Sequence, residues 1–215
     1  IYPDSSFVGL DVSAGMFKDV NQPRPNNLNI EFVVGDIQNM GFDNQTFQRA
    51  TAMHMLYHVP DINKGINEIA RVLSDEGICL VTANSLKSKI TKGELKMAVV
   101  EMLGRTDYPD LSERFNIEGG EDMLKSSFKD VQLITYESKL KLTDPTPYVE
   151  YFDSLREFWD PQPTSEEWKR ALFLVRESIA NKIGEKGCFE ESNIFGLFIC
   201  SNPIRGSNVT GQKKL

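Results

Sequence analysis

Short apolar segments separated by polar turns constrain the fold of this chain more than any other feature of its sequence. Such segments cover residues 7–11, 30–34, 50–55 and 78–83. Continuous apolar runs of this length are typical of strands buried on both faces of a parallel sheet. Between the last two segments, Ile66, Ile69, Ala70 and Leu73 recur at the spacing of one helix face. Strands that alternate with helices predict βαβ units and an α/β fold.

The second half of the chain is expected to be richer in helix. Helices are predicted over residues 92–103, 121–128, 144–158 and 165–183, and strands over 131–142 and 189–202. The longest of these helices carries an apolar stripe, which is typical of a helix packed against a core. The stripe consists of Trp168, Leu172, Val175, Ile179 and Ile183. Residues 205–215 are polar, and they are predicted to form a flexible tail.

Charge and hydropathy exclude several classes of protein. The 24 basic and 31 acidic side chains give a net charge of −7 without a dense basic patch, which disfavours nucleic acid as a partner. No apolar run approaches the ~18 residues that a membrane helix needs, so no membrane partner is expected. The cysteines Cys79, Cys188 and Cys200 lie far apart in apolar segments. They predict buried thiols in a reducing compartment, by default the cytoplasm.

Polar residues at the carboxyl ends of the predicted strands are the first candidates for a binding site, because open α/β sheets bind ligands there. Asp11 ends the strand over residues 7–11, and Asp36 follows the strand over residues 30–34. One carboxylate can accept hydrogen bonds from both hydroxyls of a ribose, and the other can accept from an adenine amino group. Together they predict a nucleoside site, whereas either one alone is better explained as a helix cap or a turn.

Four stretches of the chain, in this order, resemble the motifs of class I S-adenosylmethionine-dependent methyltransferases. They are residues 8–16, 35–47, 54–61 and 68–77. The last stretch contains Glu68, Arg71-Val72-Leu73 and Gly77, which are similar to the end of a helix in that family. The resemblance covers residues 7–84 and is closest to the small-molecule enzymes of ubiquinone and menaquinone biosynthesis.

The resemblance implies a Rossmann-like, mostly parallel sheet with helices on both faces and an antiparallel C-terminal strand. It places the strand over residues 7–11 near the middle of that sheet. Residues 1–84 would form the S-adenosylmethionine-binding core, and residues 85–204 would complete the same domain with closing strands. An inserted helical lid is expected over about 144–184. The implied activity is methyl transfer to a small-molecule acceptor, and the acceptor and the oligomeric state stay open.

The resemblance also implies roles for residues of the cofactor site. Asp11 would bind the ribose, Met16 would lie against the adenine, Asp36 would bind its exocyclic amine, Ile37 would meet the ring edge, and Met53 and His54 would lie beside the methionine part. The chain departs from the family pattern at Gln48, where an Asp is usual, and at Glu76, which replaces the first glycine of a pair. Neither departure is expected to affect the chemistry.

Candidate catalytic groups follow the third strand. His54, Tyr57 and His58 are candidates for a base, which the reaction needs only when the acceptor must lose a proton. His54 and His58 have the spacing of zinc-binding histidines, but Met55 stands where that motif needs Glu, so no metal is predicted. An aromatic set is expected to line the acceptor pocket. It comprises Tyr148, Tyr151, Phe152, Phe158 and Trp159.

The glycine-rich loop that cradles the methionine part in this family is not found in the 215 residues. The native polypeptide is therefore expected to contain some tens of residues before Ile1, including a first strand and a glycine-rich turn.

Two other functions stay open for this sequence. The missing loop makes a non-catalytic, methyltransferase-like binding protein the first of them. A nucleotide-dependent oxidoreductase is the second, because Asp11 also suits the ribose of NAD. That reading needs a G-x-G-x-x-G motif before Asp11, and the Gly35-Asp36 pair speaks against it.

Overall fold

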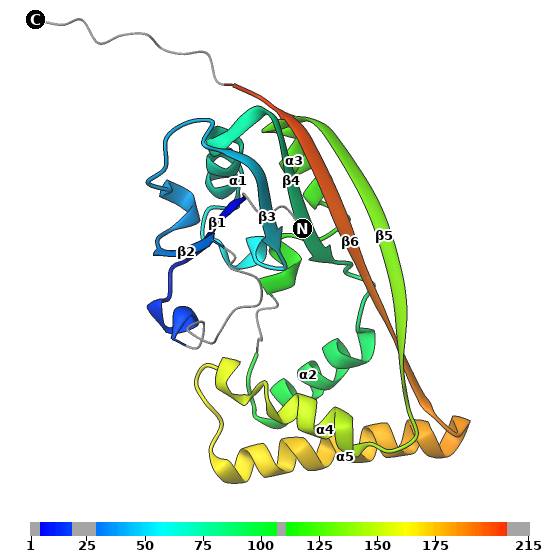
Figure 1. Ribbon diagram of the computed structural model, residues 1–215. Coiled ribbons are helices and arrows are strands. Elements are labelled where there is room, and N and C mark those ends of the chain that lie inside the picture. Colours follow the sequence, from blue (N-terminus) through cyan, green and yellow to red (C-terminus); the bar gives the residue numbers. More distant parts are fainter. Residues whose placement is uncertain (1–4, 19–28, 107–110, 206–215) are drawn as a thin grey trace, which may run out of the picture. The chain divides into compact units, whose positions relative to one another are not determined.

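The computed structural model describes residues 5–18, 29–106 and 111–205 (Figure 1). Its strands are β1 (Ser6–Asp11), β2 (Asn29–Val34), β3 (Phe47–Met53), β4 (Leu73–Asn84), β5 (Phe128–Leu142) and β6 (Phe189–Pro203). Its helices are α1 (Ile62–Val72), α2 (Ile90–Met102), α3 (Gly120–Lys125), α4 (Thr146–Asp153) and α5 (Ser165–Lys186). The predicted tail beyond Arg205 lies outside the described residues.

The described strands form two sheets. β1 and β2 pair in parallel, and β3, β4, β6 and β5 follow one another in a four-stranded sheet in which β3 and β4 are parallel. β6 runs antiparallel to β5, because Asn202 bonds to Asp130 while Asn193 bonds to Ser138, so residue numbers rise along one strand as they fall along the other. The predictions of an α/β fold and of an antiparallel C-terminal strand are thus confirmed.

The expected central place of the first strand is wrong for the described residues. β1 pairs with β2 alone, and neither strand contributes a buried side chain. Among the residues that the structure describes, no strand joins β1 to β3. The two-stranded sheet therefore remains separate from the four-stranded one.

Two compact units make up the chain. The first unit comprises Ile1–Ala83, Arg114–Ile134 and Leu197–Leu215, and the second comprises Asn84–Glu113 and Thr135–Gly196. The long strands β5 and β6 contribute residues to both.

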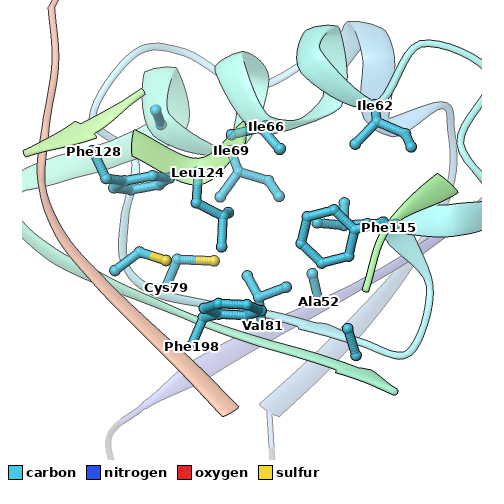
Figure 2. Packing of buried hydrophobic residues seen from close by; sticks show 14 of the residues in the cluster. Ala52, Ile62, Ile66, Ile69, Cys79, Val81, Phe115, Leu124, Phe128 and Phe198 are labelled. Carbon is cyan, nitrogen blue, oxygen red and sulfur yellow. The ribbon is translucent and has the colours of Figure 1, made fainter. Parts of the chain in front are cut away.

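The core of the first unit lies between α1 and the sheet. Figure 2 shows Ile62, Ile66 and Ile69 of α1 pointing toward Val81 of β4 and Phe198 of β6. Helix α1 therefore buries its apolar face against strands, as the spacing of its apolar residues predicts.

The second unit has a core of its own, built by α2, α4 and α5. Phe152 of α4 stacks on Trp168 of α5 with ring centroids 5.8 Å apart. Trp168, Val175 and Ile179 are buried, so most of the predicted stripe on α5 packs into this core. Thr164 and Glu167 form a reciprocal capping box at the start of α5, and Gly187, with φ of 75°, ends it.

Three elements differ from the sequence-based predictions. β4 begins at Leu73 rather than at residue 78, because fully buried Leu73 pairs with Phe47 before the strand bulges. The bulge depends on Gly77, where a Cβ would lie 2.8 Å from the carbonyl oxygen of Ser74. β3 ends at Met53, because His54 adopts a φ of 50°, far from the φ of about −120° that is typical of parallel strands. The helix predicted over 144–158 is divided into α4 and the short 3-10 turn Arg156–Phe158.

A cationic clamp explains two residues of the last sequence motif. Arg71 Nε donates to Glu68 Oε1 at 2.7 Å, and the guanidinium also donates to the carbonyl oxygens of Met40 and Phe42 at 2.9 and 2.8 Å. Glu68 in turn accepts from the backbone N–H of Met40 at 2.9 Å. The pair fastens the turn before β3 to helix α1.

This clamp predicts a pH-dependent stability difference. The hydrogen bond from Arg71 is the main cause that lowers the pKa of Glu68 below its usual value. A carboxylate with a lowered pKa stabilises the fold above the pKa it has when unfolded, and loses that effect as the pH falls through the lower, folded value. We expect Glu68→Gln to lower the free energy of unfolding by about 1–2 kcal/mol near pH 7. Urea unfolding measured from pH 7 down to pH 3 should show the difference shrinking in acid, and a constant difference would contradict this assignment.

Two further expectations concern buried thiols and membrane-spanning helices. Cys79 and Cys200 are free and buried, as predicted, whereas the free Cys188 is only half-buried. Burial raises the pKa of Cys200 to about 12 and also raises that of Cys79. No helix in the described part of the chain has the length and apolar character that crossing a membrane requires.

Candidate functional site

Asp11 and Asp36 lie at the carboxyl ends of adjacent parallel strands. Asp11 pairs with Val34 in the ladder, and its carbonyl oxygen accepts from the N–H of Gly35 at 2.9 Å. Gly35 lies close to the Leu10 side chain, since a Cβ there would be 2.8 Å from Leu10 Cδ1. The chain therefore passes close to β1 and brings Asp36 to the same sheet edge as Asp11.

A side-chain amide holds the carboxylate of Asp36. Gln38 donates to Asp36 Oδ1 through its backbone N–H at 2.8 Å, and its Nε2 lies 3.1 and 3.0 Å from the two carboxylate oxygens. These bonds, the backbone one first, lower the pKa of Asp36. Gln38 Oε1 also accepts from the N–H of Asp61 at 2.9 Å, so the same side chain reaches the N-cap of α1.

The carboxylate of Asp11 is half-buried and accepts from the N–H of Ser13 at 2.8 Å. Ser13 precedes the short 3-10 turn Ala14–Phe17, which carries Met16. The Met16 side chain is 65% exposed, so it is available to a flat apolar ligand.

Met53 ends β3 and His54 follows it, where the chain turns sharply. The backbone N–H of His54 donates to Thr82 at both its carbonyl oxygen (3.2 Å) and its Oγ1 (3.0 Å). The Thr82 hydroxyl also lies 3.6 Å from Met53 Sδ. Positive φ at a residue with a side chain costs energy, so the bonds to Thr82 hold a turn that would otherwise relax. Sequence reasoning missed Thr82, because it reaches this turn from a strand 28 residues later.

Tyr57 and His58 lie on the next turn, between two buried anchors. Leu56 and Val59 are buried in the core of the first unit, while His58 is exposed between them. The rings of Tyr57 and His58 contact each other with centroids 4.6 Å apart. Arg114 holds this turn through backbone carbonyls, a contact that sequence reasoning also missed.

The ends of β2 and β3 meet at helix α1. Gly65 of α1 lies where a Cβ would be 3.4 Å from Val59 Cγ1 and 3.6 Å from Ile37 Cγ2. Together with the bond from Asp61 to Gln38, this contact brings the segment of Asp36 beside the turn of His58. The candidates that follow these two strands are thus gathered in one unit.

These residues fit the nucleoside part of S-adenosylmethionine. Two carboxylates at one sheet edge supply acceptors for a ribose diol and for an adenine amine, and half-buried Ile37 lies next to the second of them. The hydrogen bonds from Gln38 lower the pKa of Asp36, and the ionised carboxylate has both oxygens as acceptors. Among the described residues, no cluster of three or more histidine, cysteine or acidic side chains could hold a metal ion.

The aromatic residues expected at an acceptor pocket lie in the second unit, and most of them are not available to a ligand. Tyr148, Phe152 and Trp159 are buried in that unit's core, so this part of the expectation is wrong. Tyr148 donates to Glu191 Oε2 at 3.2 Å, and burial raises its pKa. Tyr151 and Phe158 stay exposed. The spacing of aromatic residues along a helix is the same for a face that packs into the core and for a face that binds a ligand. The sequence pattern alone therefore could not distinguish an acceptor pocket from a core.

Comparison with protein families identifies the segment that carries this site. Residues 2–81 match the family described as a methyltransferase domain. The match contains Asp11, Asp36, Met53 and His54, and it confirms the resemblance found in the four sequence motifs.

Curated relatives match stretches of this chain that are similar in length to the family match. A demethylmenaquinone methyltransferase of Staphylococcus carnosus is 34% identical over 83 residues, which are 38% of this chain and 34% of that protein. A demethylmenaquinone methyltransferase of Staphylococcus epidermidis is 36% identical over 77 residues, 35% of this chain and 32% of that protein. The alignments thus span about a third of the length of these relatives.

Solved structures share the fold of nearly the whole chain. A proposed methyltransferase from an antibiotic biosynthesis pathway of Anabaena variabilis has a TM-score of 0.63 and 14% identity, covering 90% of this chain and 81% of its own. A proposed methyltransferase from Bacillus halodurans has a TM-score of 0.53 and 16% identity, covering 93% and 84%. Identity this low shows the fold alone, and that fold is the Rossmann-like one that the motifs predicted.

Proposed function

We propose that this polypeptide, whose residues 2–81 carry the methyltransferase domain, transfers the methyl group of S-adenosylmethionine to a small-molecule acceptor. The observation that carries the proposal is the placement of Asp11 and Asp36 at the ends of adjacent strands within that domain. A reducing compartment suits the two buried free thiols, and we place the protein in the cytoplasm.

The candidate residues divide the binding of the cofactor among them. Asp11 binds the ribose hydroxyls, and Asp36, held by Gln38, accepts from the adenine amine. Met16 and Ile37 cover the adenine, and Met53 and His54 lie beside the methionine part. When bound, S-adenosylmethionine supplies a methyl group already activated on a sulfonium, so the protein's main task is to position donor and acceptor.

A base is needed only for an acceptor that must lose a proton. The imidazole of His58 is the first candidate, because it is exposed, contacts the Tyr57 ring and belongs to a turn that Arg114 holds. His54 is the second candidate, because it lies at the turn that ends β3. Tyr57 takes part by orienting His58.

The relatives suggest which acceptor to test first. Both are named demethylmenaquinone methyltransferases, so we propose a hydroquinone-type aromatic acceptor. The test incubates the full-length polypeptide with S-adenosylmethionine that carries a trideuterated methyl group and with a reduced demethylmenaquinone analogue. A product that gains the labelled methyl supports the proposal, while binding of S-adenosylmethionine without transfer to any acceptor favours the alternative, a non-catalytic binding protein.

The Asp36–Gln38 contact predicts a loss of base specificity. A carboxylate accepts from the amino group of adenine and repels the oxygen that replaces it in hypoxanthine, provided that the carboxylate keeps its orientation. We expect Gln38→Met to reduce the preference for S-adenosylhomocysteine over S-inosylhomocysteine about three- to tenfold. Isothermal titration gives both affinities, and their ratio is insensitive to the fraction of folded protein.

The matched control for this variant is Gln48→Met, since Gln48 is an exposed glutamine on β3. The control should keep the wild-type preference. An unchanged ratio in Gln38→Met would remove Gln38 from the site.

A further inference from the structure

Arg114 holds three backbone carbonyl acceptors around the turn of His58. Its Nη1 donates to the carbonyl oxygen of Tyr57 at 3.1 Å, and its Nη2 donates to those of Val59 and Pro60 at 2.8 and 2.7 Å. The planar guanidinium presents its donors in a fixed fork, so these bonds restrain the orientation of the turn as well as its position.

Both partners of this contact are anchored in the core of the first unit. Phe115, next to Arg114, is 1% exposed, and its ring lies 6.1 Å from that of Phe198. On the other side, Leu56 and Val59 are buried on either side of Tyr57 and His58. Arg114 therefore connects two fixed points, and the segment between the two anchors has little freedom to move.

The carbonyl bonds leave the side chains of Tyr57 and His58 outside the clamp. The hydrogen bonds that Arg114 makes to this turn go to backbone carbonyl oxygens on both sides of His58. These bonds restrain the backbone of His58, while its imidazole stays exposed. Arg114 can therefore influence His58 only through the backbone of the turn.

We propose that Arg114 is a positioning residue that fixes the Tyr57–His58 turn at the acceptor end of the site. The inference rests on the proposed methyl transfer for its catalytic consequence, but not for its structural part. Loss of the clamp lets the turn shift, and misplacement of a reacting or proton-accepting group by about 1 Å is enough to slow a reaction strongly. The binding of the cofactor, which depends on Asp11 and Asp36, is left intact.

The chain offers a direct readout of this turn, because it contains two histidines, His54 and His58. Their imidazole C–H signals are assigned in two-dimensional NMR spectra with the variants His54→Gln and His58→Gln. The Tyr57 ring, 4.6 Å from that of His58, shifts the His58 signals. We expect Arg114→Ala to move the His58 signals toward their unfolded position, to leave those of His54 in place, and Arg114→Lys to restore part of the shift.

Arg205 provides a matched control. Its guanidinium also holds backbone carbonyls of the first unit, those of Ala70 and Leu73 at 2.7 and 2.8 Å, and it bonds to Asp75. Arg205→Ala removes a similar cationic clamp away from the His58 turn. It should lower stability while leaving the His58 signals and the methyl-transfer rate per folded molecule unchanged.

The kinetic arm measures methyl transfer in the full-length polypeptide. Arg114→Ala is expected to lower kcat roughly ten- to a hundredfold with an unchanged KM for S-adenosylmethionine. His58 signals that stay in place in Arg114→Ala, or that move as far in Arg205→Ala, would overturn the positioning role. A wild-type protein without methyl transfer overturns the proposed function and the kinetic consequence, while the NMR arm still decides whether Arg114 positions the turn.

Discussion

Replacing Asp11 by alanine is expected to weaken the binding of S-adenosylhomocysteine about ten- to a hundredfold, because a hydrogen bond to a charged group contributes about 1.5–3 kcal/mol. The carboxylate lies at the end of β1, where it would accept from the ribose hydroxyls. Its present partner is the N–H of Ser13, a local turn that the fold can lose at small cost. The effect should therefore fall on binding rather than on folding.

Two further variants separate the charge from the fold. Asp11→Asn keeps an acceptor for Ser13 and should lose less affinity than Asp11→Ala. Glu31→Ala removes an exposed carboxylate from β2, in the same two-stranded sheet, and should bind like the wild type. Titration calorimetry with circular dichroism as the folding check measures all three. Equal affinities for Asp11→Ala and Glu31→Ala would exclude Asp11 from the site.

Replacing Phe198 by alanine is expected to cost about 3–5 kcal/mol of unfolding free energy, the usual effect of deleting a buried aromatic ring. Phe198 is fully buried on β6 and packs against Phe115 in the core of the first unit. The space is already tight, because a Cβ on Gly120 would lie 2.9 Å from the Phe115 ring and 3.2 Å from that of Phe198. A loss of this size removes a large part of the ~5–15 kcal/mol that stabilises a typical domain.

Phe173→Ala is the control for this loss. Phe173 lies on α5 and is 66% exposed, so its removal should change stability by less than about 0.5 kcal/mol. Chemical denaturation of both variants gives the comparison. A cost for Phe198→Ala no larger than that for Phe173→Ala would mean that the core shown in Figure 2 is not the one that holds the first unit together.

Strand-terminal residues were predictable from sequence because their position follows from local pattern alone. A short apolar run that ends in Asp11 predicts that this carboxylate lies at the end of a strand, and the run over residues 30–34 predicts the same for Asp36. The order of the four motifs then indicated the methyltransferase family, and the family match over residues 2–81 confirms that resemblance.

Tertiary partners were not predictable in this way. Thr82, Arg114 and Gln38 hold the turns of the site across 28, 57 and 23 residues of chain, respectively, and no local periodicity marks them. Burial of aromatic residues was misjudged for the same reason, because Tyr148 and Trp159 meet partners from other helices. The place of β1 depends on pairing, which the described residues do not supply beyond β2.

Under the proposed function, the Asp11–Asp36 edge binds S-adenosylmethionine rather than another nucleotide. Isothermal titration of the full-length polypeptide with S-adenosylmethionine, S-adenosylhomocysteine and NAD tests it most directly. The proposed site predicts saturable binding of both sulfur nucleosides at one per chain and no binding of NAD. Saturable binding of NAD, or heat from none of the three ligands, would contradict it.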